Sequence, residues 1–455
     1  GVRARAQVLS ARRPARQGAR LAAACAVLVY AGCGAWSERP PGSAAWEPPV
    51  ADSAGTGDSP QDTGPEAPDT GVPFPCDEGA GTTIRQPAQR SYLVTEPRIP
   101  WFPAGAVVST EAEANLLVMY GGQWPGDVEP GEPFWSVLFG YDATTGERRF
   151  EAHSKRLEWE RPDEIHVDGD GIATLLTGID YNVNTGEARL VSRYAHDGAV
   201  VGTLTGPDDR RGSTAWFADY LAVGYPDWQA GAHLGAIVVY PGPLVGEMGI
   251  ESAAFLHVTL WEGGELGYFT NVGDADGDGI DDVTLIVNQN YFVTGTDLLV
   301  DGGVGNGLSV HVDGGGGNVV AAGDLSGDGL ADWTSIDIDI YGHGTLSVVE
   351  GPSLVMSARI RDLDPDRLDY MLLNLGSVGD LDGNGHDTIV VAAENPYPES
   401  HEVFLLDGPL CGVVDVRRDG WRFVDGVGAP GIFPAAVADH SMLLAGDAEA
   451  FMLHW

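Results

Sequence analysis

The feature that most restricts the fold of this chain is an acidic nine-residue loop that occurs three times. Its copies read Asp274-Ala-Asp-Gly-Asp-Gly-Ile-Asp-Asp282, Asp324-Leu-Ser-Gly-Asp-Gly-Leu-Ala-Asp332 and Asp380-Leu-Asp-Gly-Asn-Gly-His-Asp-Thr388. Oxygen-bearing side chains occupy positions one, three and five, and a glycine occupies position six. Alternate side chains can then converge on one point while the glycine lets the backbone turn sharply, which suits a hard cation such as calcium. The recurrence predicts a calcium-binding repeat protein.

The predicted ligands are the side chains at positions one, three, five and nine and the backbone carbonyl at position seven. In the first loop they are Asp274, Asp276, Asp278, Ile280 and Asp282. In the second they are Asp324, Ser326, Asp328, Leu330 and Asp332. In the third they are Asp380, Asp382, Asn384, His386 and Thr388. Because Thr388 replaces an acid and Asp387 is one place out of phase, we expect the third site to be weaker, giving two or three calcium sites.

The residues that flank the loops exclude an EF-hand. Such a site needs a helix on each side and a glutamate at position twelve, where this chain has Leu285 and Ser335. The runs after the loops are typical of strands: Val283–Val287, Trp333–Ile336 and Ile389–Ala393. A solvated Asp/Gly turn would explain any single loop, but it does not explain why Gly at position six and Asp at position nine repeat.

Weaker copies of the same unit appear when the chain is aligned on loop position nine. The aligned positions are residues 115, 174, 219, 282, 332, 388 and 440, which are 59, 45, 63, 50, 56 and 52 residues apart. In the copy that ends at Thr174, His166 and Thr174 replace both end acids, so Asp168 and Asp170 are predicted to form a plain turn. Seven copies of a four-strand unit predict an all-β, seven-bladed β-propeller.

The repeat resembles the FG-GAP family, which is related to the propeller of integrin α chains. The three loops resemble the first half of its motif, and Leu221–Pro226 followed by Gly235–Tyr240 resembles the second half. The likeness covers residues 105–455 and is strongest over 213–410. The resemblance implies that a strand from the N-terminal side completes the last blade, for which Ser91–Thr95 is the candidate, with Trp455 packed rather than frayed.

The N-terminal part of the chain is predicted to direct export. Six arginines precede the apolar run Leu21–Gly32, which at 12 residues is too short to span a bilayer. Residues 1–32 therefore read as a signal peptide, and Ala31-Gly32-Cys33 resembles a bacterial lipoprotein box in which Cys33 is acylated. Residues 33–75, rich in Pro, Gly, Ser, Asp and Thr, read as a flexible tether before the propeller at 76–455. The prediction is a lipoprotein of the cell envelope; the alternative is a plain secreted protein.

Charge and cysteine content restrict partners and compartment. A formal net charge of −41 without a basic patch beyond the N-terminus argues against nucleic-acid binding, and an anionic membrane would be reached only through a lipid anchor. An oxidising compartment would permit a Cys76–Cys411 disulfide that joins the two ends of the domain, although two free thiols are also compatible with the sequence.

No catalytic motif is present in the sequence, so we expect no enzyme. Two functional classes remain. The first is a monomeric, surface-anchored module that binds a protein or glycan, as in adhesion. The second is a carbohydrate-binding or polysaccharide-active propeller that uses aromatic residues between blades. Six tryptophans could stack on sugars but are more often packing residues in propellers: Trp101, Trp124, Trp135, Trp216, Trp228 and Trp261.

Overall fold

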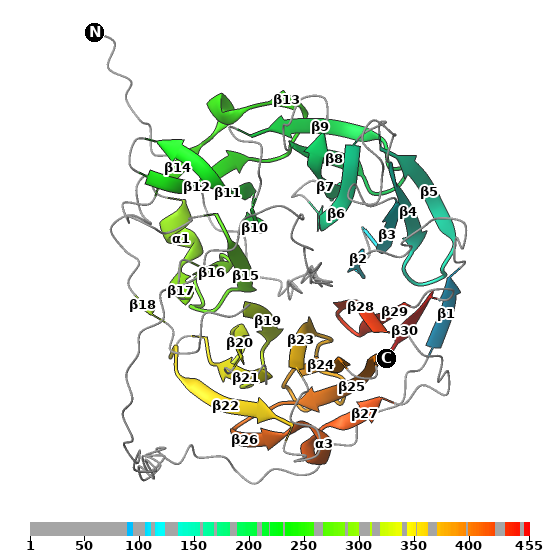
Figure 1. Ribbon diagram of the computed structural model, residues 1–455, viewed down its shortest axis with the longest axis vertical. Helices are drawn as coiled ribbons and strands as arrows, with labels where there is room; N and C mark the ends of the chain where they lie inside the picture. The colour runs from blue at the N-terminus through cyan, green and yellow to red at the C-terminus, as the bar shows by residue number, and fades with distance from the viewer. Residues whose placement is uncertain are drawn as a thin grey trace, which may run out of the picture.

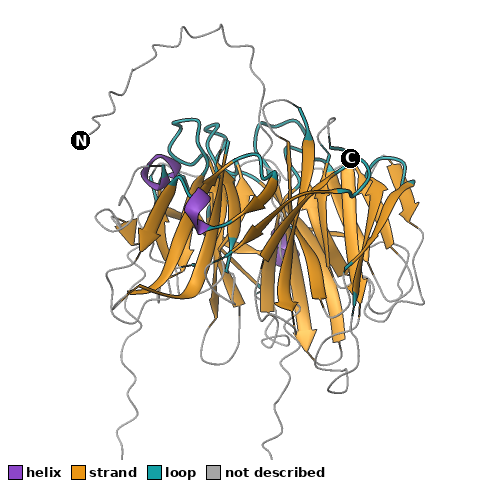
Figure 2. Ribbon diagram, turned by 90° about the horizontal axis from the view of Figure 1, so that it is seen from above, coloured by secondary structure: helices purple, strands orange, loops and turns teal. Residues whose placement is uncertain are grey.

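The computed structural model describes residues 89–455 apart from internal segments, the longer of which are 94–104, 123–134, 183–188, 259–266, 300–309, 312–318, 363–370 and 424–432. The strands form seven sheets of four or five strands arranged around a central axis (Figure 1). Seen from the side, the strands of each sheet stand next to one another (Figure 2). The fold is a seven-bladed β-propeller, as the sequence predicted.

Each blade begins with its innermost strand, and we number the blades in chain order. Blade 1 contains β2 (Gly105–Ser109), β3 (Leu116–Gly122), β4 (Ser136–Asp142) and β5 (Arg148–His153). Blade 2 contains β6 (Glu158–Val167), β7 (Ala173–Asn182), β8 (Arg189–Tyr194) and β9 (Val200–Thr205). Blade 3 contains β10 (Thr214–Phe217), β11 (Tyr220–Ala230), β12 (His233–Pro241) and β14 (Phe255–Val258).

The second half of the ring follows the same order. Blade 4 contains β15 (Phe269–Gly273), β16 (Asp282–Ile286), β17 (Asn290–Val293) and β18 (Val310–His311). Blade 5 contains β19 (Val319–Gly323), β20 (Asp332–Ile338), β21 (Gly344–Val349) and β22 (Met356–Arg361). Blade 6 contains β23 (Met371–Ser377), β24 (Thr388–Pro396), β25 (Glu399–Asp407) and β27 (Trp421–Phe423).

The core lies between blades rather than in one central layer. The described residues form seven apolar clusters, one between each pair of neighbouring blades. Successive residues of one strand therefore enter different clusters: Leu116 and Val118 pack toward blade 2, whereas Leu117 and Met119 pack toward blade 7. Because both faces of such a strand are buried, its sequence is continuously apolar rather than alternating.

Blade 7 closes the ring by combining the two ends of the described chain. It contains β28 (Phe433–Ala438), β29 (Ser441–Ala445) and β30 (Ala450–His454), and β1 (Gln89–Leu93) pairs antiparallel with β30. The blue β1 lies beside the red β30 in Figure 1. The predicted N-terminal closing strand is thus confirmed, although it begins two residues earlier than expected. Trp455 packs against the apolar cluster between blades 6 and 7, as predicted. Pairing β1 with β30 leaves no open edge on β30.

Two blades have a fifth strand, and here the prediction of four strands per blade was wrong. In blade 2, β13 (Gly246–Met248) pairs parallel with β9; in blade 5, β26 (Gly412–Asp415) pairs parallel with β22. Each added strand comes from the blade that follows, between that blade's third and fourth strands. Both follow a Gly-Pro-Leu-x-Gly turn, Gly242–Gly246 and Gly408–Gly412, which leads the chain outward onto the neighbouring blade.

Helices are short in the described part of the chain: η2 (Ile250–Ser252), α1 (Gly295–Leu298) and α3 (Val416–Asp419). None of the helices found there has the length and apolar character needed to span a bilayer. Cys411 is disulfide-bonded. Cys76, Cys33 and the predicted signal peptide and tether, residues 1–75, lie outside the described residues.

Candidate functional site

The three acidic loops occupy equivalent places in neighbouring blades. Each joins the innermost strand to the second strand: β15 to β16 in blade 4, β19 to β20 in blade 5 and β23 to β24 in blade 6. In blades 4 and 5 the register shifts before Gly273 and Gly323, respectively, which precede the loops. Both glycines have a positive φ, 84° and 71°, which a side chain would strain. The same backbone turn is thus built at the same place in each repeat.

The first loop brings three of its predicted ligands together. Oxygens of Asp274, Asp276 and Asp282 lie within 4.8 Å of one another, and no other group of three acidic, histidine or cysteine side chains in the described residues does so. Asp274 is fixed because it accepts hydrogen bonds from the backbone N–H groups of Gly277 and Gly279, at 2.8 and 3.0 Å. Three carboxylates at this separation repel one another, and they form a donor set that suits a hard divalent cation.

The first loop has one further predicted carboxylate ligand, Asp278. One oxygen of Asp278 accepts a hydrogen bond from the backbone N–H of Ile280 at 2.8 Å, and the other contacts the hydroxyl of Thr296 on α1. Asp278 is exposed and is not a member of the group of three. Its role as a ligand, like that of the Ile280 carbonyl, stays a prediction.

The acid at position nine is the structural centre of each of the first two loops. Asp282 is fully buried, and its two oxygens accept hydrogen bonds from the backbone N–H groups of Ala275, Asp276 and Gly295, at 2.9, 3.1 and 2.8 Å. It therefore holds the loop on one side and the turn after β17 on the other. Burial raises the pKa of Asp282 to about 7, against the lowering effect of these hydrogen bonds.

The second loop repeats this arrangement in blade 5. Asp332 is fully buried and accepts hydrogen bonds from the backbone N–H groups of Ser326 and Gly351, at 2.8 and 2.9 Å. Burial raises its pKa to about 7 as well. Asp324 accepts from Gly327 and Gly329, at 2.6 and 2.8 Å, as Asp274 does in the first loop. The two loops therefore share most of these backbone hydrogen bonds, although position three is an aspartate in one and Ser326 in the other.

The third loop is completed by a residue that the sequence analysis missed. Thr388 at position nine is buried, and its hydroxyl donates to Asp407 Oδ1 at 2.9 Å, across the β24–β25 pair. The amide of Asn384 at position five donates to Asp407 Oδ2 at 2.7 Å. The buried acid that contacts this loop thus comes from β25 rather than from position nine. The pairing of residues 388 and 407 depends on strand register, so no signal within the loop itself could have revealed it.

The predictions for the copy at 166–174 and for the aromatic residues are confirmed only in part. In the copy at 166–174, His166 stacks on Trp216 with 4.1 Å between ring centroids, while Asp168 and Asp170 lie outside the described residues. Of the six tryptophans considered for sugar stacking, Trp135, Trp216 and Trp228 pack against clusters between blades, which confirms the packing alternative for them. Trp101, Trp124 and Trp261 lie outside the described residues.

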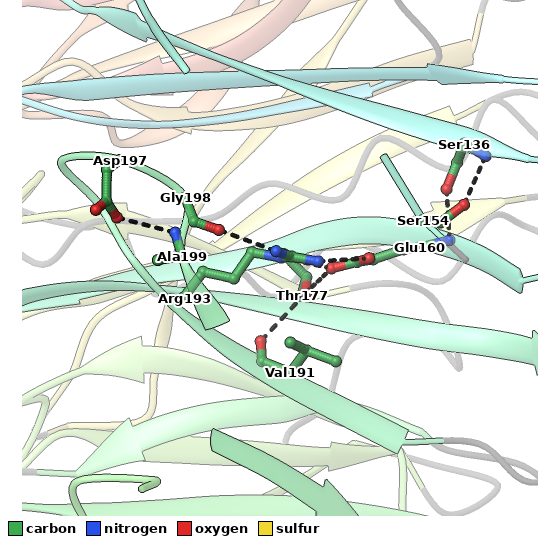
Figure 3. Close-up of polar contacts among 9 residues, drawn as sticks. All are labelled: Ser136, Ser154, Glu160, Thr177, Val191, Arg193, Asp197, Gly198 and Ala199. Atoms are coloured by element: carbon green, nitrogen blue, oxygen red, sulfur yellow. Dashed lines mark hydrogen bonds and ion pairs between the residues drawn. The ribbon is translucent and has the colours of Figure 1, made fainter. Parts of the chain in front are cut away.

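Blade 2 has a buried ion pair (Figure 3). Both carboxylate oxygens of Glu160 on β6 accept from the guanidinium of Arg193 on β8, at 2.8 and 2.9 Å, and Thr177 on β7 donates to Glu160 at 2.5 Å. Arg193 also donates to the carbonyl of Gly198 at 2.9 Å, and Glu160 and Arg193 are only 2 % and 8 % exposed. This network joins the three inner strands of the blade by charge-assisted hydrogen bonds.

Comparisons with known proteins find only distant structural similarity. No family model matches the chain, and no curated protein matches it. Among solved structures, a chain of a mitotic checkpoint complex aligns with 89 % of this chain and 99 % of its own length, at 9 % identity and a TM-score of 0.46. The WD40 domain of Pan2 from Neurospora crassa aligns with 82 % of this chain and 97 % of its own length, at 8 % identity and a TM-score of 0.44. The propeller domain of the Trilobed protease from Pyrococcus furiosus aligns with 77 % of this chain and 95 % of its own length, at 8 % identity and a TM-score of 0.38.

The two buried position-nine acids predict a distinctive pH dependence without divalent ions. Because Asp282 and Asp332 keep their protons up to about pH 7 in the folded chain but lose them near pH 4 when unfolded, folding stability falls as the pH rises between these values. The expected slope is up to about 1.4 kcal/mol per pH unit for each carboxyl group. Thermal unfolding in chelator from pH 5 to 8 measures it. Repulsion among the other acids also lowers folding stability as the pH rises, so a control is needed. The double variant Asp282→Asn, Asp332→Asn should show a shallower decrease of stability with pH than the wild type. An unchanged slope would show that these two acids do not cause the decrease.

Removing one partner of the buried ion pair should destabilise the protein strongly. Arg193→Met leaves the Glu160 carboxylate buried without its counter-charge, and we expect a loss of about 3–5 kcal/mol in unfolding free energy. The matched control is Arg148→Met, since Arg148 and Glu151 pair at 3.4 Å with side chains 47 % and 39 % exposed. Such a surface pair contributes roughly 0–1 kcal/mol. Denaturant unfolding compares the two variants, and equal losses would contradict this account.

Proposed function

We propose that this protein is a calcium-stabilised β-propeller that acts as a non-catalytic interaction module. The observation that carries the calcium half of this proposal is the convergence of Asp274, Asp276 and Asp282 at one turn of blade 4. A cation there would offset the repulsion among three carboxylates, one of them fully buried, and calcium is the common hard cation for such oxygen donors. Its role is structural, because the loop joins two strands of a single blade.

Blade 5 supports a second site of the same kind, since Asp324 makes the same two backbone hydrogen bonds as Asp274, and Asp332 makes two of the three that Asp282 makes. The placement of each loop between the first and second strands of a blade is also what the resemblance to the FG-GAP, integrin α-like repeat implies. The third loop differs, because Asp407 is already bound by Thr388 and Asn384. Two sites therefore have the stronger support.

The interaction half of the proposal follows from the ring itself. Loops on one face of a rigid propeller present a broad surface to a macromolecular partner, and the net charge of −41 disfavours nucleic acid. A protein partner is favoured over a glycan, because the three described candidate tryptophans are occupied in packing between blades. Capture of cell-surface proteins on the immobilised propeller, with calcium and with chelator, tests this. Retention of a soluble polysaccharide with no protein partner would favour the glycan alternative.

For location, we propose a lipoprotein of the bacterial cell envelope, anchored through Cys33 and held off the membrane by the tether at 33–75. The support comes from the basic and apolar segments before Ala31-Gly32-Cys33. Incorporation of a fatty-acid analogue that is lost in Cys33→Ser would support acylation. Equal labelling of the two forms would contradict it.

Loss of a single loop acid should reveal the cation. Asp328→Ala removes a predicted ligand that accepts a hydrogen bond from the backbone N–H of Leu330, at 2.9 Å. We expect it to cancel most of the rise in melting temperature that calcium gives to the wild type, while costing less than about 1 kcal/mol in chelator. Thermal unfolding with calcium and with chelator measures both quantities.

The matched control is Asp197→Ala in blade 2. Asp197 accepts the same kind of bond, from the backbone N–H of Ala199 at 2.9 Å, but lies outside the three loops. It should leave the calcium-induced rise intact. If Asp328→Ala costs as much in chelator as in calcium, the acid acts without a metal and the proposal fails.

A further inference from the structure

The three acidic loops are in direct contact with one another. The backbone N–H at position eight of each later loop donates to the carbonyl at position one of the loop before it: Ala331 to Asp274 at 3.1 Å, and Asp387 to Asp324 at 2.8 Å. The side chain at position seven of each later loop lies against the glycine at position four of the earlier one, Leu330 against Gly277 and His386 against Gly327. The loops of blades 4, 5 and 6 therefore form one continuous row.

The contact between blades 5 and 6 has an additional carboxylate. Asp387 Oδ2 accepts a hydrogen bond from the backbone N–H of Asp324 at 2.9 Å, so Asp387 binds both backbone polar groups of that residue. Asp387 is in turn held within its own blade by a hydrogen bond from the Ser377 side chain. In the contact between blades 4 and 5 the equivalent residue is Ala331, which has no such group.

Close approach of this carboxylate requires a glycine. A Cβ atom on Gly323 would lie 2.0 Å from Asp387 Oδ2, and the φ of Gly323 is 71°. The residue immediately before the second loop therefore has no side chain, and the carboxylate of the next blade takes that space. The carboxylate of Asp387 therefore packs directly against the turn at Gly323.

The third loop is itself fixed by internal hydrogen bonds. Asp407 accepts from Thr388 and Asn384, and Asn384 Oδ1 accepts from the backbone N–H of His386 at 2.7 Å. The carbonyl of Asp387 also accepts from the backbone N–H of Gly408 at 3.1 Å. Asp387 thus projects from a turn that its own neighbours hold in place.

We propose that Asp387 is a positioning residue for the cation site of blade 5, which it serves by fixing the backbone of Asp324, the first ligand of that site. The inference rests on the proposed function and extends it: the third loop holds the backbone of the second loop in place. A ligand that is already held in place loses less conformational freedom when the cation binds. The contact from Asp387 therefore raises the affinity of the neighbouring site for the cation.

Calcium titration of three variants tests the proposal. Asp387→Ala removes the acceptor for the Asp324 N–H and should weaken calcium binding in blade 5 by roughly tenfold, the effect of about one hydrogen bond. Asp387→Asn keeps an acceptor oxygen and should stay within about twofold of the wild type. Terbium luminescence sensitised by Trp333, which directly follows Asp332, reports on this site.

Asp439→Ala is the matched control. The carboxylate of Asp439 lies against Gly379, the residue before the third loop, as the carboxylate of Asp387 lies against Gly323. Asp439→Ala removes one negative charge, as Asp387→Ala does. It should stay within about twofold of the wild type. Equal weakening by Asp387→Ala, Asp387→Asn and Asp439→Ala would assign the effect to charge and overturn the proposal, as would an unchanged affinity in Asp387→Ala.

Hydrogen exchange in chelator separates this proposal from the calcium proposal. The amides of residues 324–330 should exchange faster in Asp387→Ala than in the wild type or in Asp439→Ala, with no metal present. Unchanged exchange would overturn the positioning role even if calcium binds. If the wild type bound no calcium, the proposed function would fail, and the exchange rates alone would decide whether Asp387 fixes the turn.

Discussion

A carboxylate buried beneath a turn is the interaction on which the organisation of the site depends. Asp282 and Asp332 each lie at the start of the second strand of a blade and accept backbone N–H groups from two separate turns. Such groups would otherwise be left without partners where the chain reverses, and an unpaired buried N–H group is costly. The acid satisfies them, but its own charge is then buried. A cation bound by the exposed acids of the same loop would counter that charge, and the stability of the turn would then depend on the cation.

The row of loops shows how a local motif gains a role in the ring. Blades 4, 5 and 6 are built mainly from strands close in sequence, yet the acidic turns of blades 4 and 5 each contact the turn of the next blade through backbone groups and a position-seven side chain. Apolar clusters also join these blades, and apolar contacts are not directional. Directional contacts at the turns can therefore set the position of one loop relative to the next, which apolar packing alone specifies less strictly.

Different blades stabilise their inner strands and turns with different polar contacts. Blade 4 gathers three acids, blade 6 replaces the last acid by Thr388 and supplies Asp407 from the third strand, and blade 2 places a bidentate Glu160–Arg193 pair among its three inner strands. Two blades also gain a fifth strand from their neighbour. Repetition fixes the strand order, while the polar contacts inside each blade vary, as expected of a repeat that contacts only its neighbours.

The closing strand near Ser91 was expected from the family resemblance, whereas the residues alone specify the repeat, the seven blades and the position of the acidic turns. These follow from short-range rules: Asp and Gly at fixed spacing make a tight turn, and continuous apolar runs make strands buried on both faces. The three-dimensional structure was needed to show that Asp407 completes the third loop, that Asp387 binds Asp324 across 63 residues, and that Glu160 binds Arg193 across 33. These contacts depend on strand register and on the packing of one blade against the next, and neither is specified by the residues on one side of the contact.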